Sequence, residues 1–280
     1  TTVDEVGNVI ITKPATAGME NRKSIVLQSH LDMVCQKNND VTFDFETQGI
    51  QMEVDGDWVK AKGTTLGADN GLGVATIMSI LESTDIPHPE LEALFTIDEE
   101  TGMTGALGLK PGQLQGQILL NLDTEEDDEI DIGCAGGVEV TVSNTYATEN
   151  AKGETVKIEV KGLRGGHSGM DIHKGFGNSN IIIGRLLYKG LENQNLQVIS
   201  IDGGSLRNAI PREANALVSV KNANEFLATL ETLKNEILEE FAAIEAHLQI
   251  NITVAESTGK AISEEDSKKL IYVLKSLHNG

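Results

Sequence analysis

Apolar residues in the first half of the chain are spaced alternately like strands and like a helix. Short apolar runs bounded by polar residues predict three strands: 24–29 (SIVLQS), 91–97 (LEALFTI) and 117–122 (QILLNL). Residues 71–82 have apolar positions at helical spacing and predict a helix. Residues 52–61 predict a hairpin that turns at Asp55-Gly56. Strands that alternate with helices indicate a layered α/β domain.

The second half has a different order of elements. Strands and helices are predicted in the order β-α-β-β-α-β, at 154–160, 178–191, 196–202, 214–220, 224–247 and 249–255. This order is that of a ferredoxin-like α+β unit. A final helix, 264–277, is predicted to begin after an N-cap at Ser263. The polar stretch 143–153 separates the halves, so we expect domains at 1–145 and 146–280.

Composition limits the classes of partner and compartment. The chain has 280 residues and a formal net charge of −21, which argues against binding to nucleic acid or anionic membranes, because both require a basic face. Its longest apolar runs are shorter than the roughly 18 residues of a membrane span. The 2 cysteines and the missing leader pattern predict a reducing, cytoplasmic location.

Charged side chains follow three of the predicted strands at the point where each ends. His30 follows SIVLQS, Glu99 and Glu100 follow LEALFTI, and Asp123 follows QILLNL. Open α/β sheets bind ligands outside the carboxyl ends of their strands. We therefore expect these side chains to share one edge of the sheet.

The segment His30-Leu31-Asp32 suggests a histidine ligand with an orienting carboxylate. In an extended segment, residues two apart point the same way, so Asp32 is expected beside the His30 imidazole. Metal-bound histidines usually need such a partner to fix their tautomer. Alone, the pattern also fits a surface histidine near an aspartate.

The glycine-rich segment 63–73 (GTTLGADNGLG) places Asp69 just before the predicted helix. Four glycines in this segment indicate backbone that turns tightly or approaches another group closely. A carboxylate at Asp69 could bridge two metal ions. The alternative is that Asp69 or Asn70 caps the helix.

Adjacent acidic residues at 98–100 could serve as a metal ligand and as a general base. One carboxylate can bind a metal ion while its neighbour reaches the nucleophilic water as a general base. The alternative is a solvated acidic turn. Imidazole together with carboxylates is a ligand set for Zn²⁺, Mn²⁺ or Co²⁺. Two such ions about 3.5–4 Å apart suit amide hydrolysis.

Longer motifs make the chain similar to the M20 family of metallopeptidases. The segments that carry the resemblance are SHLDMV, KGTTLGADNGLGVA, DEETGMTGA, LLNLDTEEDDEIDIGCAGG, KGLRGGHSGMDIHKGFGNSN and GGSLRNAIPREA. The resemblance implies a zinc-peptidase-like layered α/β catalytic domain followed by a ferredoxin-like lid and dimerisation domain. It also implies a small peptide as substrate and a homodimer formed through the lid.

The resemblance implies a role for individual residues. It makes Asp32 the residue that orients His30, Glu99 the general base and His167 the donor that stabilises the oxyanion, with Asn208 in contact with substrate. The implied metal ligands are His30, Asp69, Glu100 and Asp123, with Asp69 as the bridge, often next to a cis peptide bond. The implied cofactors are two divalent ions, zinc first, with cobalt or manganese as alternatives.

Several alternatives stay open at this stage. Without the resemblance, His167 fits a turn histidine flanked by glycines, while His88, His247 and His278 are expected at the surface. The predicted activity is hydrolysis of dipeptides, including Xaa-His. An M20-type deacylase, a tripeptidase, or a non-catalytic metal- or peptide-binding module would use the same residues. The chain also resembles a central fragment, without the family's N-terminal helix, the return of the catalytic domain and the final histidine ligand.

Overall fold

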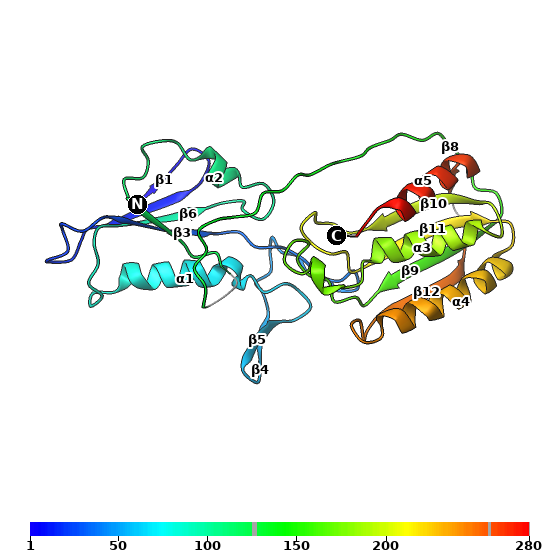
Figure 1. Cartoon of the computed structure of the whole chain (residues 1–280), viewed down its shortest axis with the longest axis horizontal. Helices are drawn as coiled ribbons and strands as arrows, with labels where there is room; N and C mark the ends of the chain where they lie inside the picture. The colour runs from blue at the N-terminus through cyan, green and yellow to red at the C-terminus, as the bar shows by residue number, and fades with distance from the viewer. Residues whose placement is uncertain (125–127, 257–258, 280) are drawn as a thin grey trace. The chain divides into compact units, whose positions relative to one another are not determined.

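The computed structural model describes residues 1–124, 128–256 and 259–279, which fall into two compact units (Figure 1). Unit 1 comprises Thr1–Gly137 and unit 2 comprises Val138–Gly280. The division lies in the connection between β7 (Ile118–Asn121) and β8 (Thr148–Asn150). The boundary expected at 145/146 falls in the same connection, a few residues further along the chain.

Unit 1 is built on a five-stranded sheet in the order β1-β2-β6-β3-β7. Strands β3, β6 and β7 are parallel to one another, and β2 is antiparallel to β6. The bounds of the strands that precede β7 are β1 (Thr2–Val3), β2 (Val9–Lys13), β3 (Ile25–His30) and β6 (Leu91–Thr96). Because the three parallel strands run in one direction, their carboxyl ends lie at one edge of the sheet.

Apolar side chains cover both faces of this sheet. All six residues of β6 are buried, as expected for a strand in the middle of a parallel sheet. On one face α1 (Ala68–Glu82) packs Ile77 against a cluster that includes Leu27 and Phe95. On the other face Val26 and Leu94 form a second cluster with residues of the segment that precedes β7. Unit 1 also contains α2 (Thr104–Gly108).

The predicted strands of unit 1 and its hairpin are confirmed. The hairpin consists of β4 (Met52–Asp55) and β5 (Trp58–Ala61), with Gly56 at a φ of +61° in the turn. The helix predicted at 71–82 begins three residues earlier, although Asp69 and Asn70 have non-helical backbone angles. Strands β1 and β2 were not predicted, because these short segments become strands only by pairing: β2 with β6, and β1 with β2.

Unit 2 contains a four-stranded antiparallel sheet in the order β10-β11-β9-β12. The helices α3, α4 and α5 pack apolar side chains against it around one continuous core (Figure 1). The strands are β9 (Glu154–Lys161), β10 (Leu196–Gly203), β11 (Ala214–Val220) and β12 (Gln249–Ala255), and the helices are α3 (Ser179–Leu191), α4 (Ala223–Phe241) and α5 (Glu264–Ser276). The predicted β-α-β-β-α-β order is confirmed. Two short elements were not predicted: the pair β8–β13 (Lys260–Ile262) and the 3-10 turn at Ile172–Lys174.

Two local expectations for this part of the chain have different outcomes. Ser263 caps α5 as predicted, because its side chain accepts a hydrogen bond from the Asp266 N–H. The helix predicted at 224–247 ends at Phe241, so its last turn and a half was wrong. Glu245 lies in the following turn, where its buried carboxylate accepts hydrogen bonds from the Arg164 and Gly177 N–H groups. These long-range bonds favour a turn over further helix.

The expectation that His88 lies at the surface is wrong. The His88 side chain is 4% exposed, and its Nδ1 lies 2.7 Å from the carbonyl oxygen of Pro89. The backbone N–H of His88 donates to the hydroxyl of Thr16, which lies shortly after β2. His247 and His278 are exposed, as expected. Among the described residues, no helix is long and apolar enough to cross a membrane.

Candidate active site

His30 ends β3 at the carboxyl edge of the sheet, with only 1% of its side chain exposed. Its Nδ1 lies 3.0 Å from the backbone oxygen of Asp32, and its Nε2 lies 3.1 Å from Oδ1 of Asp69. The Nδ1–H group therefore donates to a carbonyl, and the Nε2 atom faces carboxylates. Burial lowers the pKa of His30, but the neighbouring carboxylates of Asp123, Asp69 and Asp32 outweigh burial and raise it.

Asp32 connects the end of β3 to the loop that follows β6. Its two carboxylate oxygens accept hydrogen bonds from the backbone N–H groups of Glu99 and Glu100, each at 3.0 Å. One of these oxygens also lies 3.4 Å from Nδ1 of His30. The side chain thus lies beside the imidazole, as the spacing predicted, and the imidazole's closer contact is with the Asp32 backbone oxygen.

Asp69 lies at the start of α1, where a helix cap was the alternative to a ligand. The helical element begins after Gly67, whose φ is +80°, and is kinked at Asp69 and Asn70, which have non-helical backbone angles. The Asp69 carboxylate faces His30, as expected for a ligand. The Asp69 side chain is 64% exposed and approaches Nε2 of His30. The Asp69–Asn70 peptide bond is cis.

Glu99 and Glu100 lie in the loop after β6, in the same electronegative surroundings. Burial raises the pKa of the Glu99 carboxyl, and the charge of Asp123 adds to the effect. Burial, with the charges of Asp69 and Glu99, raises the pKa of Glu100 to about 7. Repulsion between clustered carboxylates would be relieved by a bound cation, so the cluster has the electrostatics of a cation site.

Asp123 follows β7 and is oriented by Asn70, whose sequence position predicted at most a helix cap. The side-chain amide of Asn70 donates hydrogen bonds to Oδ1 of Asp123 and to the backbone oxygen of Leu122, both at 3.0 Å. Asn70 is 4% exposed, and the Ser29 hydroxyl contacts its side-chain oxygen. The other carboxylate oxygen of Asp123 lies 3.8 Å from Nε2 of His30. The signal in the sequence was the position of Asn70, directly after a ligand candidate.

The potential ligand atoms fall into two overlapping groups that share His30. One group contains His30, Asp69 and Glu100, and the other contains His30, Glu99 and Asp123. In each group the ligand atoms lie within 4.8 Å of one another. One imidazole with several carboxylates fits a borderline divalent cation such as zinc and does not resemble a thiolate-rich structural site. The four predicted ligands and the predicted base therefore meet at one edge of the sheet.

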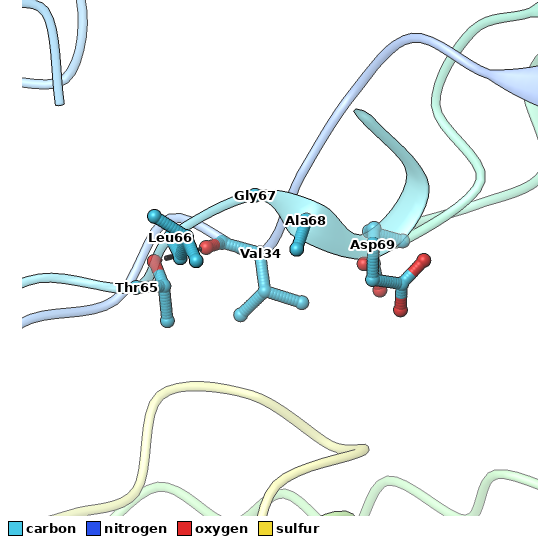
Figure 2. A pocket seen from close by; sticks show the side chains of 7 residues that line it. Val34, Thr65, Leu66, Gly67, Ala68 and Asp69 are labelled. Carbon is cyan, nitrogen blue, oxygen red and sulfur yellow. Dashed lines mark hydrogen bonds between the residues drawn. The ribbon is translucent and has the colours of Figure 1, made fainter. Parts of the chain in front are cut away.

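A small pocket opens beside this cluster (Figure 2). It has a volume of about 270 Å³, and its lining includes the side chains of Asp69 and Glu100. The rest of the lining comes from Val34 and residues 65–68, where the Thr65 hydroxyl donates to the Val34 backbone oxygen. The pocket thus brings solvent-accessible space directly to two of the expected ligands.

His167 and Asn208 lie on two adjacent loops of unit 2. The Ser168 N–H donates to the Asn208 backbone oxygen at 2.7 Å, and His167 forms a backbone bridge with Ala209. The His167 side chain is exposed, and its Nδ1 accepts hydrogen bonds from the N–H groups of Gly169 and Met170. In the neutral ring this arrangement places the proton on Nε2, which then can donate outward.

Comparisons with known proteins show what the chain is similar to. Residues 158–256 match the peptidase dimerisation domain of the M20 peptidases. The chain is 47% identical, over 99% of its own length, to the cytosol non-specific dipeptidase of Escherichia coli. Residues 158–256 thus match the M20 dimerisation domain, and nearly the whole chain is similar in sequence to a dipeptidase.

A solved structure gives a similar result. The crystal structure of aminoacylhistidine dipeptidase from Vibrio alginolyticus is 43% identical to this chain, covers 98% of it and gives a TM-score of 0.57. The chain spans 58% of the Escherichia coli protein and 57% of the Vibrio chain, less than two thirds of either. M20 peptidases use divalent metal ions, in agreement with the imidazole and carboxylate donors at the sheet edge.

Proposed function

We propose that this chain provides the metal-binding region and the lid of a dipeptidase that hydrolyses short peptides, including Xaa-His. The observation that carries the proposal is the convergence of His30, Asp69, Glu100 and Asp123, with Glu99 among them, at one edge of the sheet. The similarity to two proteins named as dipeptidases supports this choice of substrate.

The proposed ligands would hold two divalent ions, zinc by preference. His30 and Asp123 would serve one ion, Glu100 the other, and Asp69 both. The hydrogen bond from Asn70 leaves the second oxygen of Asp123 directed toward His30. Divalent ions supply two effects in such sites: they lower the pKa of water and polarise a carbonyl group.

Glu99 is the proposed general base. The backbone N–H of Glu99 is fixed by Asp32, which leaves its carboxyl group among the ligands, and burial raises its pKa toward the working range of a base. In that role Glu99 takes the proton of the attacking water and passes it to the leaving amine. Asp32 orients both the imidazole of His30 and this loop.

Unit 2 would contribute the groups that contact the peptide. His167 has its Nδ1 occupied by two backbone donors, which supports a role for Nε2–H as the oxyanion donor. Asn208 is proposed to contact the substrate. Residues 158–256 are proposed to form a homodimer, in line with the dimerisation domain that they match. A cytoplasmic location agrees with the name of the Escherichia coli relative.

The test is a substrate panel with the full-length enzyme and added zinc. Carnosine and other dipeptides are compared with tripeptides and N-acyl amino acids, and kcat/KM is measured for each. We expect dipeptides to be preferred. A preference for N-acyl amino acids or tripeptides would replace the proposed substrate, and no turnover of any amide would refute the hydrolase.

A further inference from the structure

Asn8 is a buried polar residue far from the ligand cluster, in the turn between β1 and β2. Its side chain is 0% exposed, although it carries both a donor and an acceptor. A buried amide is retained only where its hydrogen bonds are satisfied, so its partners indicate what it does.

The partners of Asn8 are the two ends of the loop that contains Glu99 and Glu100. Its Nδ2 donates to the backbone oxygen of Gly105 at 2.9 Å, and its Oδ1 accepts from the backbone N–H of Ile97 at 3.4 Å. The Gly105 N–H also donates to the Ile97 oxygen at 3.2 Å. One amide therefore closes the base of the loop 97–105.

Asn8 is itself held rigidly by Asp4. One carboxylate oxygen of Asp4 accepts from the backbone N–H groups of Val6, Gly7 and Asn8, and the other accepts from Nδ2 of Asn8 at 2.8 Å. This arrangement fixes the turn and the orientation of the amide. The amide cannot reorient without breaking hydrogen bonds at both Asp4 and the loop.

The base of the loop has no room for a looser arrangement. A Cβ atom added at Gly105 would lie 2.7 Å from both the nitrogen and the oxygen of Ile97 and would also overlap Oδ1 of Asn8. Within the loop, the carboxylate of Asp98 contacts the hydroxyls of Thr101 and Thr104. At its other side the loop is fixed by Asp32, through the N–H groups of Glu99 and Glu100.

We infer that Asn8 is a positioning residue that fixes the loop 97–105 and thereby the carboxyl groups of Glu99 and Glu100. The inference rests on the proposed function for its catalytic consequence. Misplacement of a catalytic group by about 1 Å can cost roughly 10²-fold in rate. Loss of the Asn8 amide should therefore lower kcat much more than it changes KM.

The experiment uses Asn8→Ala and Asn8→Asp in the full-length enzyme. Asn8→Asp keeps an acceptor for the Ile97 N–H but loses the donor to Gly105 and places a second carboxylate beside Asp4. We expect faster hydrogen exchange at the amides of 97–105 in both variants. With zinc in excess, we expect kcat to fall by about 10²-fold while KM stays within about twofold.

The matched control is Glu92→Ala. Glu92 lies near the amino end of β6, at the other end of the strand from the loop 97–105. Glu92 is 4% exposed, and its carboxylate accepts hydrogen bonds from the N–H groups of Gln115 and Gly116. Like Asn8→Ala, this substitution removes a buried side chain that hydrogen-bonds to the backbone of a distant segment. The hydrogen bonds of Glu92 are to residues 115 and 116 and not to the loop 97–105. We expect Glu92→Ala to lower stability while kcat and exchange in 97–105 stay as in the wild type.

The outcomes separate this inference from the proposed function. Unchanged exchange in 97–105, or an equal fall in kcat in Glu92→Ala, would overturn the role of Asn8. If the wild type hydrolyses no amide, the proposed function fails, and hydrogen exchange still decides whether Asn8 fixes the loop. If Asn8→Ala does not fold, the milder Asn8→Asp, which keeps the side-chain volume and the acceptor for the Ile97 N–H, still tests the role through hydrogen exchange in 97–105.

Discussion

The side-chain amide of Asn70 donates a hydrogen bond to Oδ1 of Asp123 at 3.0 Å. This bond joins the start of α1 to the end of β7, two segments that each supply a proposed metal ligand. Partners of this kind fix the orientation of a ligating carboxylate. The hydrogen bond between Asn70 and Asp123 is therefore part of the proposed metal site.

Asn70→Ala is expected to weaken metal binding by about 10–100-fold, because the Asp123 carboxylate loses the donor that orients it. Zinc affinity is measured by competition with a chelating dye. The matched control is Thr76→Ala in the same helix, where an exposed hydroxyl donates to the Leu72 backbone oxygen at 2.8 Å. Equal zinc affinity in the two variants would contradict the orienting role of Asn70.

Glu99→Gln is expected to keep its metal content and lose about 10²–10⁴-fold in kcat, because an amide cannot take a proton from water. Metal content is measured by elemental analysis and kcat with a dipeptide in the full-length enzyme. Glu90→Gln, in an exposed position before β6, serves as the control. A Glu99→Gln variant with the wild-type rate would remove Glu99 from the mechanism.

Asp69→Ala is expected to lose both metal and activity, since both ions would share this carboxylate. This outcome differs from that of Glu99→Gln, in which only activity falls. The measurement is the number of zinc ions bound per chain after dialysis. A variant that retained the wild-type stoichiometry would show that Asp69 is not the bridge.

Metal binding is expected to release protons near neutral pH. Burial, with the charges of Asp69 and Glu99, raises the pKa of Glu100 to about 7, and a ligand carboxylate must be ionised. Between the unfolded pKa, about 4.3, and about 7 the metal-free folded state binds more protons than the unfolded state. Its stability should therefore fall as pH rises through this window.

Zinc should reverse that loss of stability. The measurements are thermal unfolding of the metal-free protein at several pH values, with and without zinc, and calorimetric zinc titration in buffers of different ionisation enthalpy. A zinc titration that released no protons at pH 6 would contradict the raised pKa of Glu100.

Glu159, on β9 of unit 2, provides a pH-dependent contribution to stability. Hydrogen bonds from Asn251 and Lys157, each at 3.0 Å, lower the pKa of the Glu159 carboxyl to about 2. A carboxyl whose pKa is lower in the folded state stabilises the fold at pH values above its pKa in the unfolded state. That contribution is lost as pH falls toward about 2. Because the group is partly exposed, we expect Glu159→Gln to lower the free energy of unfolding by about 1 kcal/mol at pH 7.

The difference between Glu159→Gln and the wild type should shrink as pH falls below about 4, and denaturant unfolding at pH 3 to 7 measures it. Glu231→Gln is the control, because Glu231 is paired with Lys234 at 3.4 Å and its side chain is 58% exposed. A pH-independent difference for Glu159→Gln would show that the effect does not come from ionisation.

Local pattern in the sequence was sufficient for most elements and for the ligand candidates. The runs that became β3, β6 and β7 were visible because strands buried on both faces are continuous apolar segments. The charged residues at their ends could be selected because parallel strands bring their carboxyl ends to one edge. His30, Asp69, Glu100 and Asp123 were all named on this basis or by family resemblance.

Only the tertiary structure decided which residues support these ligands. Asn8 contacts Gly105 across 97 positions of sequence, and Asn70 contacts Asp123 across 53. The C-terminal end of α4 and the position of His88 depend in the same way on hydrogen bonds to distant segments, at Arg164 and Thr16 respectively. A sequence pattern reports the local spacing of apolar and polar residues, whereas the partner of a buried polar group is fixed only when distant segments pack together.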